Sequence, residues 1–284
     1  MSDLPDTLAA CAVAVLPTPD GREKTGLSKR CAEAWFAARA AGTPMPVGQA
    51  SPPDDPARPM QPELLNPRDM PRRRPGSPGG RIALLHAVAH IELNAVDLHW
   101  DIIARFTETK MPPGFYDDWV RAAAEESKHF NLVCDVLESL GSHYGALPAH
   151  ASMWRAAADT KDDFLGRLAV VPMVLEARGL DVTPGMIEIF RKAGVVNAVE
   201  ALETIYAEEV GHVAYGSKWF HFLCGRADTD PKDAFHELVR RYFHGALKPP
   251  FNDEKRAEAG IPPDFYWPLA EEHPANAAKF PTQS

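Results

Sequence analysis

The chain has 284 residues, 45% of which are hydrophobic, and a formal net charge of −9 at pH 7. This length allows one large domain or two small ones, and the composition is apolar enough for a substantial core. The negative charge argues against a protein that binds nucleic acid through general attraction to phosphate, because such a protein needs a basic face. No apolar stretch of the sequence reaches the roughly 18 residues that a membrane-spanning helix needs.

The four cysteines are scattered, and no two of them form a Cys-x-x-Cys unit. The sequence therefore suggests neither a zinc knuckle nor a redox pair, and so few cysteines fit a reducing compartment. The apolar run at residues 8–16 has acidic residues before it in place of the basic leader of a secretory signal. We therefore expect a cytoplasmic protein. The cysteines are Cys11, Cys31, Cys134 and Cys224.

Residues 5–41 show helical periodicity in two pieces, which the Pro- and Gly-containing segment 17–21 separates. Residues 44–78 contain eleven prolines, so this segment cannot be a helix and is a poor strand. We interpret it as an extended strap along a helical bundle in preference to a flexible linker, since it carries apolar residues that could anchor it. These anchors are Met60, Leu64, Leu65 and Met70.

Residues 79–245 have the periodicity of long helices, and no part of the chain shows a strand pattern. Two helical hairpins joined by one long crossover, at 142–159, are typical of a ferritin-like four-helix bundle. The long helices are expected over 81–107, 115–140, 162–180 with a kink at Pro172, and 195–223. Shorter helices are expected over 184–193, opened by Pro184, and over 231–243, followed by a Pro-rich tail.

Two Glu-x-x-His pairs lie within these helical segments, and each follows a helix with one glutamate on its apolar side. The first glutamate precedes its pair by 34 positions and the second by 33, which indicates a repeated helical hairpin. This arrangement is the ligand pattern of a carboxylate-bridged dimetal site. The six predicted metal ligands are Glu92, Glu126, His129, Glu176, Glu209 and His212.

Residues three apart on a helix project from the same face, so each Glu-x-x-His pair can bind one ion through an oxygen and a nitrogen. The remaining glutamates come from the partner helices and can bridge both ions. Mixed carboxylate and imidazole ligation suits iron or manganese better than metals that prefer thiolate. Four carboxylates also nearly balance the charge of two divalent cations, which makes their burial tolerable.

Other polar residues near these ligands have less specific patterns. We interpret Glu125 and Glu208 as solvent-exposed, with contacts behind the ligands as the alternative. His86, His90 and His99 are expected to pack or to bond the backbone, although His99 shares the face of Glu92. We also interpret Tyr206, Tyr215, Trp100 and Trp219 as core residues, and Asn94, Arg178 and Asp181 as candidates for a substrate pocket or for contacts behind the ligands.

Several segments together resemble the signature of a bacterial ferritin-like family catalogued as domain of unknown function 455. The resemblance covers nearly the whole chain, except that the first 41 residues match less distinctively. It implies an all-α, ferritin-like bundle with a metal site, but it does not imply a substrate. The chain is also similar, more distantly, to a ferritin-like hydroxylase that modifies tRNA. The matching segments are 86–98, 125–130, 176–181, 208–213 and the proline-rich approach ending in Pro71-Arg72-Arg73.

We expect three parts: N-terminal helices and strap over 1–78, a dimetal bundle over 79–245, and the tail over 246–284. The expected function is an oxygen-activating oxidoreductase, a hydroxylase or oxidase, with two iron ions and an unknown small organic substrate; manganese or a mixed pair is the alternative metal. An external electron donor is needed, since no Gly-rich dinucleotide fingerprint is present. The alternative functions are iron oxidation, peroxide scavenging or iron storage, and a metal-free binding module is the third hypothesis. We expect no membrane or nucleic-acid partner, and a monomer or dimer in preference to a cage.

Overall fold

The computed structural model describes residues 4–276, and its secondary structure is helical. Within these residues there is no β-strand, and one isolated bridge joins Leu64 to Ala149. The predicted all-α fold is confirmed. The α-helices are α1 (Leu8–Val15), α2 (Gly21–Ala40), α3 (Pro78–Arg105), α4 (Pro113–Ser139), α5 (Ser152–Asp159), α6 (Phe164–Val170), α7 (Ala177–Lys192), α8 (Val196–Arg226), α9 (Pro231–Tyr242), α10 (Asp253–Glu258) and α11 (Pro263–Glu272).

The described residues fall into two compact units. The first lies within Met1–Ala158 and Met186–Ile205, and the second within Asp159–Gly185 and Tyr206–Ser284. Helices α7 and α8 contribute residues to both units. The three-part division at residues 78 and 245 stays a prediction, as does the ferritin-like arrangement of the long helices.

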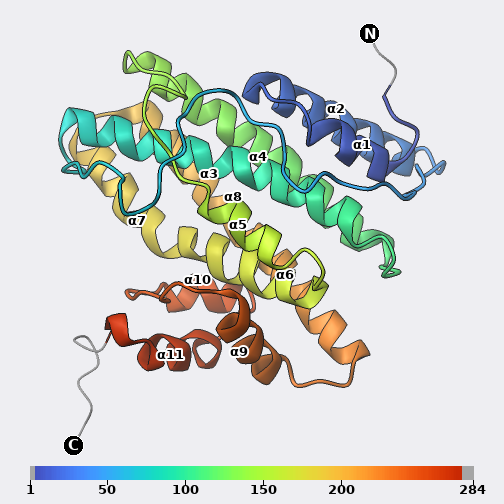
Figure 1. Cartoon of the computed structure of the whole chain (residues 1–284). Helices are drawn as coiled ribbons and strands as arrows, with labels where there is room; N and C mark the ends of the chain where they lie inside the picture. Colours follow the sequence, from blue (N-terminus) through green and yellow to red (C-terminus); the bar gives the residue numbers. More distant parts are fainter. Residues whose placement is uncertain (1–3, 277–284) are drawn as a thin grey trace, which may run out of the picture. The chain divides into compact units, whose positions relative to one another are not determined.

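In the first unit α3 packs along α4, while α1 covers α3 and α2 covers α4 (Figure 1). Helices α1, α2 and α3 each have an N-cap residue whose side-chain oxygen accepts a backbone N–H of the first turn. The N-cap residues are Thr7, Asp20 and Ser77. Gly21 lets α2 approach α4 closely, because a Cβ at this position would lie 2.7 Å from the Phe130 ring. These capping residues and this glycine fix where the covering helices start.

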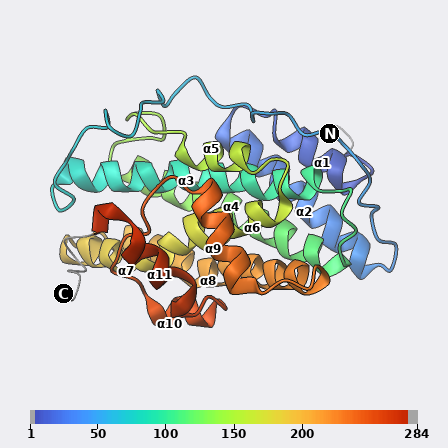
Figure 2. The same ribbon diagram turned by 60° about the horizontal axis from the view of Figure 1, so that its bottom comes forward.

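The Pro-rich strap is part of the first unit, and Figures 1 and 2 show it as an extended blue trace beside the helices of that unit. Its Pro46 and Val47 carbonyls accept the N–H groups of Leu8 and Ala9, which α1 itself leaves without partners. Farther along, the N–H of Ala57 donates to the carbonyl of Leu16. The strap is therefore held by polar contacts to helix ends.

Two buried or half-buried cations strengthen this attachment. Lys24 of α2 donates to the Ala57 carbonyl at 2.9 Å and pairs with Asp97 of α3. Arg58 of the strap donates to the Asn94 side-chain oxygen at 2.7 Å. Strap, α2 and α3 thus meet at one polar cluster.

The predicted apolar anchors of the strap were partly wrong. Met60 is 97% exposed and Leu64 is 42% exposed, while Pro56 and Pro62 are buried instead. The reason is that a chain without regular structure has no fixed periodicity, so its hydrophobic residues do not show which side faces the protein.

The second unit contains a π-helical turn, Val171–Glu176, between α6 and α7. The kink expected at Pro172 takes this form, because the wider turn accommodates a residue that has no N–H to donate. Gly216 of α8 makes room for this proline, since a Cβ on Gly216 would lie 2.4 Å from the Pro172 ring. In the same unit α9 packs against α6 and α11, and α10 packs against α11.

Two predictions about proline were wrong. No new helix opens at Pro184; α7 continues through it to Lys192. The segment expected as a tail after residue 245 contains α10 and α11. Pro263 is compatible with α11 because it occupies a first-turn position, where an N–H has no helical partner. Residues 277–284 of the expected tail lie outside the described residues.

No helix among residues 4–276 combines the length and the apolar character needed to cross a membrane. The four cysteines, all of which lie within the described residues, are buried free thiols.

Candidate metal-binding site

Three of the six predicted ligands converge in the first unit. Glu92 comes from α3, and Glu126 and His129 come from successive turns of α4. The Nδ1 atom of His129 lies 3.4 Å from Glu92 Oε2 and 3.3 Å from Glu126 Oε2. Each of the three residues offers a ligand atom within 4.8 Å of those of the other two, and all three are buried. This cluster could hold a metal ion.

The carboxylates of Glu92 and Glu126 in this cluster repel each other. Burial, and beyond it the negative charge of Glu126, raises the pKa of Glu92 well above its usual range. A bound cation would remove both penalties, because it compensates the charge that the protein interior does not solvate. Carboxylate oxygens and imidazole nitrogens are common ligand atoms for divalent metal ions.

His99 lies beside one member of this cluster, Glu126, which the sequence interpretation missed. Its Nε2 atom lies 3.6 Å from Glu126 Oε1, and its side chain is 1% exposed. The ring also packs against Trp119, with centroids 5.2 Å apart. The available signal was the seven-residue spacing from Glu92, which places both on one face of α3. That spacing does not reveal that the carboxylate of Glu126, on α4, lies close to His99.

The other three predicted ligands lie in the second unit. Glu209 and His212 are one turn apart on α8, with His212 Nδ1 3.8 Å from Glu209 Oε1. Both are buried, as is Glu176, the last residue of the π-helical turn. Among the described residues, Glu176 is not part of a cluster whose ligand atoms converge within 4.8 Å. Like the first Glu-x-x-His pair, Glu209 and His212 are buried, and the imidazole Nδ1 lies near the carboxylate one turn away.

The residues interpreted as structural have structural contacts. His86 Nε2 accepts the backbone N–H of Gly145, and His90 bonds Tyr144 and the His150 carbonyl. These bonds confirm the prediction that both histidines pack or bond the backbone. Trp100 and Trp219 are buried, and the Trp100 indole donates to Ser28. Glu125 and Glu208 are partly exposed on the same helices as the ligands.

The three candidates for a substrate pocket, Asn94, Arg178 and Asp181, form hydrogen bonds to other parts of the chain. Asn94 donates to the His90 carbonyl and accepts from Arg58. The side chain of Asp181 is fully buried and accepts two hydrogen bonds from Arg256, at 2.8 and 2.7 Å. Arg178 donates to the carbonyls of Lys248 and Pro250. These residues hold the strap and the segment around α10 in place.

The motifs that contain these residues belong to a known family pattern. The model of the family described as "Protein of unknown function (DUF455)" matches residues 17–267. The chain belongs to this family. The match spans all six predicted ligands and the strap, and it confirms the resemblance to domain of unknown function 455. The ferritin-like character of the family stays a prediction.

A relative of this DUF455 protein occurs in Haemophilus influenzae (strain ATCC 51907 / DSM 11121 / KW20 / Rd), where it is named "Uncharacterized protein". It is 40% identical over 210 residues, which cover 72% of this chain and 73% of the relative. No solved structure matches the chain. The description of the family assigns no activity, so the chemistry has to be argued from the residues.

Proposed function

We propose that Glu92, Glu126, His129, Glu176, Glu209 and His212 together bind two metal ions in a ferritin-like bundle. The observation that carries this proposal is the buried cluster of Glu92, Glu126 and His129, in which one imidazole nitrogen lies within 3.4 Å of one oxygen from each carboxylate. The second Glu-x-x-His pair repeats the geometry of the first. A repeated half-site of this type is what two ions with bridging carboxylates require.

The function that this centre supports is that of an oxygen-activating oxidoreductase, a hydroxylase or oxidase acting on a small organic molecule. When bound, two iron or manganese ions would supply the redox chemistry, and an external donor would supply the electrons. The protein's part is to hold six ligands without water around them: the ligands in the first unit are 0–3% exposed. Burial of this kind fixes the ligand geometry and excludes side reactions with solvent.

The covering helices favour this function over iron storage. Helices α1 and α2 pack on α3 and α4, so they occupy surface that a bare bundle would offer to neighbouring chains in a cage. We therefore propose a monomer or dimer. Size-exclusion chromatography with light scattering would distinguish this from a cage, which contains many chains.

The direct test of the metal centre is metal analysis after anaerobic loading with ferrous iron. The wild-type chain is expected to retain two ions. Glu126→Gln, which keeps the side-chain shape and removes the charge, is expected to lose at least one of them with an unchanged helical circular dichroism spectrum. Glu125→Gln is the matched control, because Glu125 is the preceding residue of α4 and is partly exposed. Full metal retention by Glu126→Gln, or equal loss in both variants, would contradict the proposal.

A further inference from the structure

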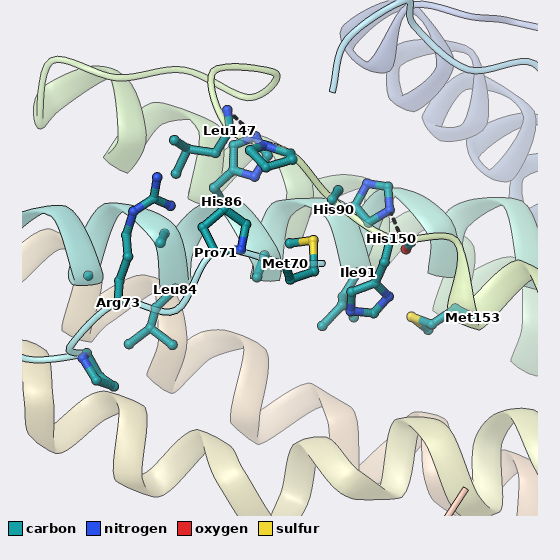
Figure 3. A pocket seen from close by; sticks show the side chains of 16 residues that line it. Met70, Pro71, Arg73, Leu84, His86, His90, Ile91, Leu147, His150 and Met153 are labelled. Carbon is teal, nitrogen blue, oxygen red and sulfur yellow. Dashed lines mark hydrogen bonds between the residues drawn. The ribbon is translucent and has the colours of Figure 1, made fainter. Parts of the chain in front are cut away.

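A cavity of about 230 Å³ lies in the first unit, on the side of α3 that faces the strap and the crossover (Figure 3). The strap contributes Met70 and Arg73, and the crossover contributes Leu147 and Met153. The α3 residues that line it include Ala87 and Ile91, which are exposed, whereas the neighbouring Glu92 is 3% exposed. None of the candidate metal ligands lines this cavity, so it is a separate site.

The walls of the cavity are fixed by hydrogen bonds. The N–H of Leu65 in the strap donates to the Ala149 carbonyl, and the N–H of Ala149 donates to the Glu63 carbonyl. His90 of α3 then holds the crossover through the carbonyl of His150 at 3.1 Å. These bonds connect the strap, the crossover and α3 to one another beside the cavity, as in a largely preformed ligand pocket.

His86 presents a hydrogen-bond donor to the cavity. Its Nε2 atom accepts the N–H of Gly145 at 2.9 Å and that of Leu147 at 3.4 Å, so the neutral ring carries its proton on Nδ1. The ring is neutral at pH 7 because burial lowers the pKa of His86 to about 4. Within residues 4–276 the hydrogen bonds of the His86 ring are those of Nε2, so Nδ1–H is left as the donor of a ring that lines the cavity.

Arg73 supplies a positive charge at the same end of the cavity. Figure 3 shows Arg73 and His86 near Leu147, with Ile91 and Met153 at the other end. Arg73 forms no hydrogen bond or ion pair with another residue of the described part, and its charge acts on His86 strongly enough to contribute to the lowered pKa. The cavity therefore has a cationic end with hydrogen-bond donors, whereas its other end combines the apolar side chains of Ile91 and Met153 with the rings of His90 and His150.

We propose that this cavity binds a monocarboxylate with an apolar body, its carboxylate on Arg73 and the Nδ1–H of His86. A guanidinium and an imidazole N–H match the two acceptor oxygens of a carboxylate, and the ionic partner strengthens both hydrogen bonds. Methionine, leucine and isoleucine side chains contact the apolar body. A dry cavity of about 150 Å³ accepts benzene, so this one suits a body of about six to eight carbon atoms.

The test uses hexanoate as the probe, with isothermal titration calorimetry of the full chain at pH 7. Hexanoate is expected to bind one per chain, and the uncharged hexanamide at least about tenfold more weakly. Arg73→Gln should weaken hexanoate binding by a similar factor. Arg72→Gln is the matched control, because Arg72 is an adjacent exposed arginine of the strap that does not line the cavity, and it should change binding less than about twofold.

A second variant tests the location independently of charge. Ala87→Phe fills the cavity from an exposed position of α3, and it should abolish binding while the helical circular dichroism spectrum stays unchanged. Absence of hexanoate binding to the wild-type chain, equal losses in Arg72→Gln and Arg73→Gln, or binding by a folded Ala87→Phe variant would overturn the proposal. Tighter binding of hexyl phosphate than of hexanoate would overturn the carboxylate assignment. None of these measurements depends on metal, so they fail or succeed independently of the proposed dimetal centre.

Discussion

The side-chain amide of Asn252 donates a hydrogen bond to the carbonyl of Leu180, at 3.2 Å. In an uninterrupted helix this carbonyl would accept the N–H of residue 184, but Pro184 has none. Asn252 also donates to Tyr206 at 2.8 Å, and its oxygen accepts the Lys255 N–H at the start of α10. The loop before α10 therefore supplies the partner that lets α7 continue through a proline.

This relationship can be tested with a double-mutant cycle. Asn252→Ser keeps an oxygen for the α10 cap and removes the donor, so it should lower the free energy of unfolding by about 1–3 kcal/mol. In a Pro184→Ala background residue 184 regains its N–H, and the same substitution should cost at least about 0.5 kcal/mol less. Urea unfolding of the four proteins measures both values. An equal cost in the two backgrounds would contradict the assigned role.

Gly216 is expected to tolerate no side chain. In Gly216→Ala the new Cβ would lie 2.4 Å from the Pro172 ring, and such overpacking should cost about 1–3 kcal/mol of unfolding free energy. The new methyl group should also displace the π-helical turn that contacts Gly216. Because this turn carries Glu176, we expect iron retention to fall as well. Gly225→Ala, on the same helix with no heavy atom near its Cβ position, should be neutral or stabilising. Similar stabilities of the two variants would rule out the close contact.

Lys24 should be needed for stability because its charge pairs with Asp97 inside the protein. Both side chains are 1–2% exposed. Lys24→Met leaves a buried carboxylate without its partner, and we expect a loss of about 3–5 kcal/mol in chemical unfolding. Lys29→Met on the same helix removes an exposed pair with Glu33 and should change stability by less than about 0.5 kcal/mol. The prediction fails if the two methionine variants unfold alike.

His86 should make the protein less stable in acid. Its pKa is lowered from 6.5 to about 4 in the folded state, chiefly by burial, so between these pH values the unfolded chain binds a proton that the native chain does not. Stability therefore falls as the pH falls from 6.5 to 4, by about 2 kcal/mol for this group once solvent screening is allowed for. Urea unfolding at several pH values should show a smaller slope for His86→Gln, and NMR should place the His86 titration near pH 4. A titration near 6.5 would contradict this account.

The helices and the metal-ligand pattern could be predicted from sequence because both depend on local periodicity. The apolar stripe of α3 and the three-residue spacing of Glu126 and His129 follow from helical geometry alone. The signal was weaker for α10 and α11, which have six and ten residues and contain or adjoin prolines. Segments this short show too few turns for a reliable period, and packing stabilises them more than propensity does.

The sequence by itself determined that the chain is helical, where three of the four expected long helices run, and which acids and imidazoles share a helix face. Only the tertiary structure decided which groups from different segments meet, such as His99 with Glu126 and Asn252 with Leu180. It also decided that Arg73 and His86 line one cavity. The physical reason is that spacing along a helix fixes the direction of a side chain relative to its own backbone. The partner that it finds depends on how segments distant in sequence pack, and no local pattern encodes that packing.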